Sequence, residues 1–292
     1  MARKSDWIIG GLLGGGVLFI AILIVLLVFG PMLSSASSFS YNGKGRIALI
    51  EIRGPISRAQ DTISQIIKHR EDDSVRAIVL RIESPGGAVA PTQEIFDELR
   101  KTREAGKIIV ASMGSVAASG GYYIACSADS IIANPGTITG SIGVIMEVPH
   151  AEGLLDKVGI GWQVVKSGKH KDIGSLSREM TDKEIGLLQS VIDDVYDQFV
   201  DAVTRYRPLS REEVVELADG RIYTGNQAVL LRLVDRLGTY QDAIALAGKM
   251  AGLPEKPKVV RQRPKTFFEM LMDNMDSMTR LYSPDIIEYR YH

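Results

Sequence analysis

Residues 76–88 read RAIVLRIESPGGA, a β-branched apolar run that ends in a Ser-Pro-Gly-Gly turn. Similar short runs recur along the chain, separated by stretches with helical spacing: RIALIEIR (46–53), KIIVA (107–111) and WQVVK (162–166). Strands that are buried on both faces read as continuous apolar runs, and their alternation with helices is typical of a parallel sheet. The sequence therefore predicts an α/β domain, beginning near Arg46, with a mainly parallel sheet.

The glycine pair that closes this first stretch has two interpretations. Ligands bind at the carboxyl ends of strands in open α/β sheets, where backbone amides can point at a substrate carbonyl. On this interpretation Gly87 supplies an oxyanion donor. The alternative is a plain turn between a strand and a helix.

A serine among small residues follows the run at 107–111. Residues 112–126 read SMGSVAASGGYYIAC, and we expect a strand that ends at Met113 or Gly114. Small neighbours let a substrate backbone approach, and glycine tolerates sharp dihedral angles. The pattern predicts that Ser119 is a nucleophile at the start of a helix and that the Gly120 amide stabilises an oxyanion. An ordinary glycine-serine turn is the alternative.

A serine nucleophile needs a base, and the chain offers both histidines and lysines. Of its four histidines, His150 and His170 remain candidates for a Ser-His-Asp arrangement. A lysine amine can serve instead when burial and neighbouring charges lower its pKa. The candidate lysines are Lys166, Lys169 and Lys171. Most lysines in polar loops are solvated surface charges, and spacing alone does not choose among these three.

The composition excludes several classes of function. A formal net charge of -1 and a pI near 6.5 give no positive excess that would attract nucleic acid. The single cysteine, Cys126, excludes an internal disulfide, and we expect it to be a buried small hydrophobe. The four scattered histidines lack metal-ligand spacing. We therefore expect neither a metal nor another cofactor.

An uncharged stretch of 27 residues, from 7 to 33, precedes the domain. A helix needs only ~20 residues to cross the hydrocarbon core, whereas the apolar run of a cleaved secretory signal is about 7–15 residues. We expect an uncleaved transmembrane helix at 7–33, a cytoplasmic N-terminus at 1–6 that carries Arg3 and Lys4, and a polar linker at 34–45. The domain itself is then extracytoplasmic.

Two helix starts and one apolar stripe are visible in the second half. Thr181 and Ser210 each begin a capping box, so helices should start there. After the first, apolar residues follow helical spacing from Ile185 to Ala202, which we interpret as packing against the core. The tail at 254–292 mixes basic and apolar residues and suits either an amphipathic helix or an ordinary docking helix.

Several motifs in a fixed order resemble the short bacterial form of signal peptide peptidase A, in peptidase family S49. They are SPGGAV (84–89), AASGGYYIA (117–125), TGSIGVIME (139–147), SGKHKDI (167–173) and RIYTGNQAVLLRLVDRLG (221–238). The resemblance covers approximately residues 46–253, which are expected to form the peptidase domain. It implies the spiral fold of the Clp-protease/crotonase superfamily and a ring-like homo-oligomer with catalytic residues contributed across subunit boundaries.

The same resemblance implies roles for individual residues. It assigns Ser119 as the nucleophile, Lys171 as the general base, Gly87 and Gly120 as the oxyanion amides, and Ser141 as a hydrogen-bond partner that orients the lysine. These assignments predict an endopeptidase, anchored in the cell membrane, that degrades remnant signal peptides. The alternatives are a related Ser-Lys protease specific for stomatin-like membrane proteins, a crotonase-type acyl-CoA enzyme, and a catalytically silent membrane scaffold.

Overall fold

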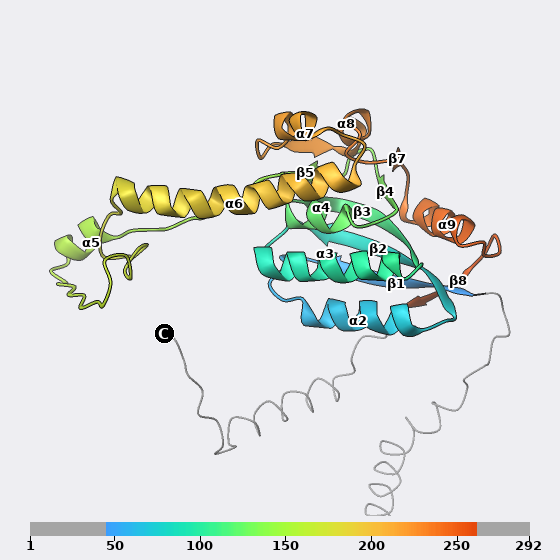
Figure 1. Ribbon diagram of the computed structural model, residues 1–292, viewed down its shortest axis with the longest axis horizontal. Coiled ribbons are helices and arrows are strands. Elements are labelled where there is room, and N and C mark those ends of the chain that lie inside the picture. Colours follow the sequence, from blue (N-terminus) through green and yellow to red (C-terminus); the bar gives the residue numbers. More distant parts are fainter. Residues whose placement is uncertain (1–44, 262–292) are drawn as a thin grey trace, which may run out of the picture. The chain divides into compact units, whose positions relative to one another are not determined.

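The computed structural model describes residues 45–261 of the 292-residue chain (Figure 1). The expected cytoplasmic segment at 1–6, the expected span at 7–33, all but the last residue of the linker at 34–45 and the tail beyond Arg261 lie outside the described residues. None of the helices within 45–261 has the length and apolarity needed to cross a bilayer.

A mainly parallel sheet forms the centre of the described domain, as the apolar runs predict. Its strand order is β6-β5-β3-β2-β1-β8, with β4 and β7 branching from β3. The strands are β1 (Arg46–Arg53), β2 (Val75–Ser84), β3 (Ile108–Ala118), β4 (Ser130–Ala133), β5 (Ile138–Gly140), β6 (Ile222–Thr224), β7 (Arg236–Leu237) and β8 (Lys258–Arg261). Within this sheet only the pair β5–β6 is antiparallel. Strand β8 pairs with β1 beyond the expected domain end at residue 253.

Both faces of the sheet are covered, which explains the continuous apolar runs. Along β1, Ala48 and Ile50 face the larger core cluster, whereas Ile47 and Leu49 face the other side. The helices that pack in the larger cluster are α2 (Gln60–Glu71), α3 (Val89–Glu104), α4 (Gly120–Ala125), the end of α6 (Asp182–Tyr206), α7 (Arg211–Leu217) and α8 (Gly225–Leu230). Helix α9 (Tyr240–Met250) packs on the opposite face through Ala243 and Ala247.

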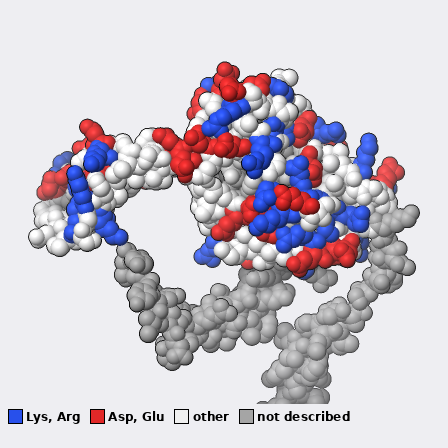
Figure 2. Space-filling model, viewed as in Figure 1, with Lys and Arg blue, Asp and Glu red and all other residues white. Residues whose placement is uncertain are grey.

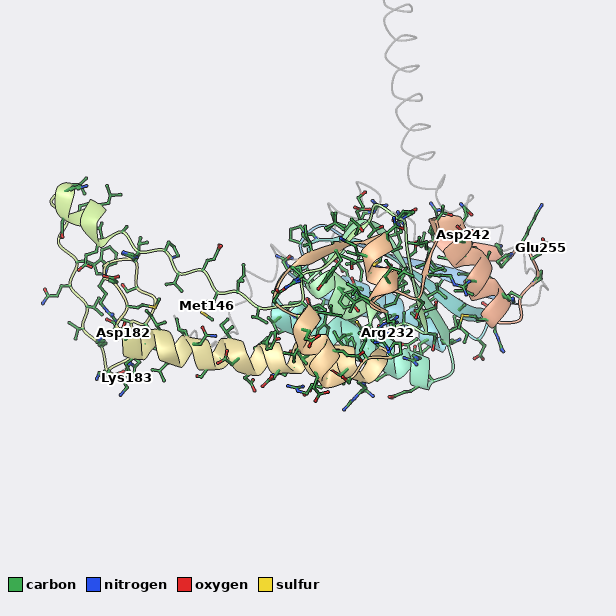
Figure 3. The ribbon with its side chains drawn as sticks, turned by 90° about the horizontal axis from the view of Figure 1, so that it is seen from above. Met146, Asp182, Lys183, Arg232, Asp242 and Glu255 are labelled. Carbon is green, nitrogen blue, oxygen red and sulfur yellow. The ribbon has the colours of Figure 1, made fainter. Side chains whose placement is uncertain are left out.

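An arm, which we define as residues 146–194, extends from the sheet-bearing part of this domain. It contains α5 (Glu152–Lys157), the loop that follows it and the first half of α6. In Figures 1 and 3 the segment that includes Met146 runs beside α6, and Asp182 and Lys183 mark the far end of that helix. Figure 2 shows mixed positive and negative residues over the sheet-bearing part and at the far end of the arm, with an uncharged stretch between them.

The arm corrects two sequence-based expectations. Residues 162–166 form no strand, because this extended segment has no neighbouring strand to pair with and is exposed throughout. The apolar stripe of α6 packs against the core only from Phe199 onward; Ile185 and Val191 are 50% and 51% exposed because the helix has left the core there. Both predicted capping boxes are present, at Thr181 and at Ser210.

Candidate active site

Three strand ends meet at one edge of the sheet, and each carries a residue singled out from the sequence. Strands β2, β3 and β5 are parallel neighbours, with Ser84 opposite Ala117 and Ala118 opposite Gly140. Ser119 and Ser141 therefore leave adjacent strands side by side. Because the carboxyl ends of parallel strands form the ligand-binding edge of such sheets, this register defines a candidate active site.

Ser119 occupies a strained turn between β3 and α4. Its φ is +52°, an unusual value for a residue with a side chain, and its N–H donates to the Gly140 carbonyl over 2.8 Å. Helix α4 starts at Gly120, as expected, but β3 continues to Ala118 instead of ending at Met113 or Gly114. Strain of this kind is characteristic of a nucleophile presented on a sharp strand-to-helix turn.

Glu83 explains why β3 continues toward Ser119. Its carboxylate accepts hydrogen bonds from the amides of Ser115 and Val116, at 2.9 Å and 3.1 Å, where the register between β2 and β3 shifts. Burial alone would raise the pKa of this carboxyl, but the two amide donors lower it below its usual range. An ionised carboxylate thus satisfies the irregular backbone shortly before Ser119.

The glycine turn after β2 lies against the same serine. The amide of Ile56 donates to the Gly86 carbonyl over 2.9 Å, and the amide of Ala88 donates to the Ile56 carbonyl over 2.8 Å. Within residues 45–261, no hydrogen bond uses the amide of Gly87 or of Gly120. Unpaired backbone amides are what an oxyanion hole requires, and the assignment of these two as its donors stays a prediction.

A cavity of about 600 Å³ joins these elements. Ser119, Ser141, Gly87 and Gly120 all line it, so the structure brings four of the five expected site residues together. The other walls are largely apolar, formed by Val89, Tyr123, Val144, Ile145, Val195, Tyr196 and Phe199. Among the lining residues Asp219 alone is charged, and hydrogen bonds from Arg221 lower the pKa of its carboxyl to about 2.

Lys171, the fifth expected residue, lies in the arm and does not line this cavity. It is exposed, and its ammonium has no hydrogen-bond or ion-pair partner within residues 45–261. The loop that carries it lies beyond the far end of α6 (Figure 1). His170 is also in this loop, whereas Lys166 pairs with Asp172. The single chain thus brings the expected nucleophile and both expected amide donors to one cavity, and it places the expected base elsewhere.

Several cavity residues were not recognised from the sequence as parts of a site. Val195 and Phe199 were assigned to a core stripe, although both line the cavity. Neither Thr92 nor Tyr123 belongs to a sequence motif that would indicate a site. Helical spacing alone could have indicated Tyr123, because it lies one turn after Ser119 on the same helix face.

The cysteine seven positions after Ser119 has no part in this site. Cys126 is fully buried at the end of α4, as expected, and burial raises the pKa of its thiol to about 12. The thiolate that a cysteine nucleophile needs is therefore strongly disfavoured.

A substitution at Gly86 tests the proximity of the glycine turn to the nucleophile. Its φ is +100°, and a β-carbon there would lie 2.7 Å from the Gly120 amide nitrogen and 2.9 Å from the Ser119 β-carbon. We expect Gly86→Ala to lower the rate of peptide hydrolysis by about 10²-fold, because displacement of a nucleophile by an ångström costs about that much. Initial rates and thermal unfolding, measured on the same sample, check this.

Gly106→Ala is the matched control for that measurement. Gly106 also has a positive φ, +87°, but nothing lies within 4 Å of an added β-carbon. Gly106→Ala should lose about 1 kcal/mol of unfolding free energy from backbone strain and keep its activity. Gly86→Ala should lose more, because its β-carbon also meets backbone atoms, and it should lose activity. Equal rates for the two variants would contradict the proximity of Gly86 to the reacting group.

Parts of the chain match two peptidase families. Residues 42–137 match the Clp protease family, and this match together with the parallel sheet and the strained serine defines a Clp-protease-like α/β peptidase. Residues 101–254 match peptidase family S49, more than half of the chain. The chain belongs to peptidase family S49 and is a serine peptidase.

Individual relatives agree with this family. A protein of Synechocystis sp., provisionally named a protease, is 48% identical over 220 residues, which cover 75% of this chain and 79% of the relative. Protease 4 of Salmonella typhi is 36% identical over 253 residues, 84% of this chain and 41% of the relative. A protein of Enterococcus faecium provisionally named signal peptide peptidase SppA is 40% identical over 185 residues, 63% of this chain and 54% of the relative. The chain thus matches less than half of the length of protease 4.

Proposed function

We propose that this serine peptidase is anchored in the cell membrane by residues 7–33 and degrades remnant signal peptides on the extracytoplasmic side. The observation that carries the proposal is the convergence of Ser119 with two unpaired amides at an apolar cavity. A signal peptide is a mainly apolar substrate, and apolar walls bind such side chains. The name of the Enterococcus faecium relative supports the same substrate class.

In the proposed mechanism, Lys171 acts on Ser119 as a neutral amine. It takes the proton from Ser119 Oγ while that oxygen attacks the peptide carbonyl, and the amides of Gly87 and Gly120 stabilise the oxyanion. The protonated lysine then donates to the departing amine, which leaves an acyl-enzyme. A water molecule, deprotonated by the same lysine, releases the acyl group and regenerates the serine. Ser141 orients the lysine amine by hydrogen bonding.

The position of Lys171 supports a site shared between subunits of a homo-oligomer. The lysine is exposed in an arm that also exposes a series of large apolar side chains: Met146, Leu154, Val158, Ile160, Trp162, Val164, Val165, Leu176, Ile185, Leu187 and Val191. Exposure of this many large apolar side chains on one segment is typical of a protein interface. We propose that the arm packs on a second copy and brings Lys171 to that copy's Ser119, in a head-to-tail contact that closes into a ring.

Hydrolysis of a synthetic signal peptide by the purified full-length chain tests the substrate assignment. We expect kcat/KM at least about tenfold above that for a polar peptide of equal length, because the apolar cavity favours apolar side chains. A fluorophosphonate probe should label Ser119 in the same sample. Mass spectrometry of the peptide products and of the labelled protein provides both measurements.

Each contrary result points to a different alternative. Labelling of Ser119 together with cleavage of one defined membrane protein, and not of signal peptides, would favour the protease specific for stomatin-like partners. Failure of both labelling and cleavage, in a folded oligomer, would favour the silent scaffold. The family assignment already separates the chain from acyl-CoA enzymes.

A further inference from the structure

The arm has almost no hydrophobic interior of its own. Between residues 146 and 194, Glu184 is the only buried residue, and its side chain is 5% exposed. The largest apolar side chains of the arm are exposed, with Val165 reaching 95%. The conformation of the loop that carries Lys171 must therefore depend on polar contacts, since few apolar contacts are available to fix it.

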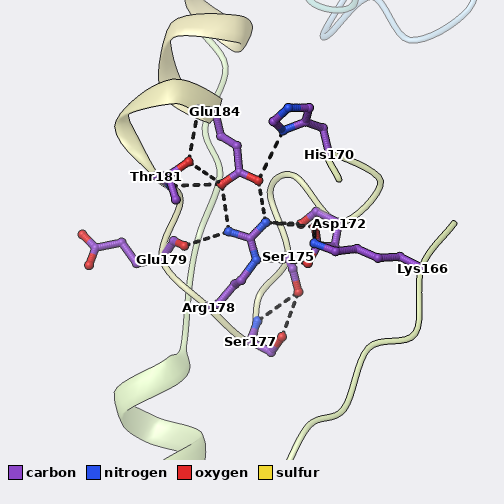
Figure 4. A network of polar contacts seen from close by, with 9 residues as sticks. All are labelled: Lys166, His170, Asp172, Ser175, Ser177, Arg178, Glu179, Thr181 and Glu184. Carbon is purple, nitrogen blue, oxygen red and sulfur yellow. Dashed lines mark hydrogen bonds and ion pairs between the residues drawn. The ribbon is translucent and has the colours of Figure 1, made fainter. Parts of the chain in front are cut away.

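Those polar contacts converge on Arg178 (Figure 4). Its guanidinium binds Asp172 in a bidentate manner, with Nε to Oδ2 at 3.1 Å and Nη2 to Oδ1 at 2.9 Å. It binds Glu184 in the same way, with Nη2 to Oε1 at 2.7 Å and Nη1 to Oε2 at 2.8 Å. The remaining N–H of Nη1 donates to the Glu179 carbonyl at 3.0 Å. All five guanidinium donors are used within the arm.

Each carboxylate of this network has a second anchor. Glu184 accepts hydrogen bonds from the amide and the hydroxyl of Thr181, both at 3.0 Å, and so also caps α6. Asp172 pairs with Lys166. Hydrogen bonds from Arg178 lower the pKa of both carboxyl groups well below their usual range, and Thr181 and Lys166 reinforce the effect. The network thus ties the loop to the N-terminus of a long helix.

Lys171 immediately precedes one of the two residues that Arg178 holds. Its own amide donates to the Gly168 carbonyl over 3.2 Å, and the Ser175 amide donates to the Asp172 carbonyl over 3.0 Å. These successive tight turns leave the backbone of Lys171 little freedom once Asp172 is fixed. Arg178 itself makes no contact with the lysine amine.

We propose that Arg178 is a positioning residue for Lys171: by bridging Asp172 to Glu184, it holds the loop in the conformation that presents the lysine amine to Ser119. The inference rests on the proposed function, because it takes Lys171 to be the base. A base that is displaced by about an ångström loses about 10²-fold in rate, whereas the apolar walls of the cavity, which bind the substrate, are unchanged. Arginine is suited to this role because its planar fork engages two carboxylates at once.

Steady-state kinetics of the full-length Arg178→Ala enzyme test the inference. We expect kcat for a synthetic signal peptide to fall by about 10²-fold with KM changed less than about threefold, since only the presentation of the base is altered. The rate of fluorophosphonate labelling of Ser119 should fall in parallel. The mass of the oligomer, measured by light scattering, should stay that of the parent. An unchanged kcat in the assembled variant would overturn the inference.

Arg211→Ala is the matched control. Arg211 also bridges two carboxylates of α6, Asp197 and Asp201, but it does so from α7 and outside the arm. The kcat of Arg211→Ala should equal that of the parent. If Arg211→Ala instead loses as much activity as Arg178→Ala, the effect comes from general destabilisation of α6, and the inference is overturned.

Glu184→Gln replaces Arg178→Ala if that variant does not assemble. We expect its kcat to fall by about tenfold with an unchanged KM, and a parental kcat in this variant would likewise overturn the inference.

Lys171→Ala, measured alongside, separates this inference from the proposed function. Parental activity in Lys171→Ala would show that the lysine is not the base, whatever the Arg178 variants do. An inactive Lys171→Ala together with a fully active Arg178→Ala would leave the proposed function intact and would refute the positioning role alone.

Discussion

Replacement of Ser119 by alanine is expected to lower peptide hydrolysis by at least about 10⁴-fold, because it removes the oxygen that we propose forms the acyl-enzyme. The oxyanion amides and the apolar cavity remain in the variant, so substrate binding should persist. Hydrolysis of a signal peptide, binding of the same peptide by fluorescence anisotropy and labelling by a fluorophosphonate together check this. Labelling should disappear and binding should be retained.

The structure provides a control serine for this experiment. Ser190 is exposed on α6, where its hydroxyl donates to the Leu187 carbonyl over 2.7 Å, and it does not line the cavity. Ser190→Ala should keep the parental rate and the parental labelling. Retention of substantial hydrolysis by Ser119→Ala would mean that another group is the nucleophile, and it would remove the reason for the strained φ of Ser119.

The sheet and the edge at which the site lies were predictable because their causes are local. Buried parallel strands require continuous apolar runs, and the glycine turn at 86–87 and the small residues before Ser119 follow directly from two of these runs. The register that places Ser119 beside Ser141 was not predicted, and it comes from the structure. Glu83 was not recognised, because a carboxylate that satisfies backbone amides across 32 positions has no local sequence pattern.

The arm was misread for a different physical reason. The period of an apolar stripe reports that one face of a helix avoids water, but it does not report what covers that face. The stripe from Ile185 to Ala202 is continuous in sequence, yet it packs against the core at Phe199 and is exposed at Ile185. Likewise the run at 162–166 has the composition of a strand but no partner strand within the domain. Both errors concern surfaces that a single chain leaves uncovered.

A mixture of two inactive variants should regain activity if the site is shared between subunits. Ser119→Ala and Lys171→Ala each remove one member of the dyad from every site of a homo-oligomer. In a randomly mixed ring with equal amounts of both, about a quarter of the sites combine an intact serine from one subunit with an intact lysine from the next. We expect about a quarter of the parental activity after subunit exchange or co-expression. Alone, Ser119→Ala should lose at least about 10⁴-fold and Lys171→Ala at least about 10³-fold.

The expectation follows from the position of Lys171, which is exposed in the arm and absent from the cavity of its own chain. A doubly substituted protein, Ser119→Ala with Lys171→Ala, mixed in equal amounts with the parent is the matched control. About a quarter of its sites should stay intact after random exchange if sites are shared between subunits, compared with about half if each site lies within one chain. If both single variants are inactive and their mixture stays inactive although mass spectrometry shows mixed oligomers, each site must use the serine and the lysine of one chain. The arm would then have to fold back toward its own cavity, and its exposed apolar side chains would need a different partner.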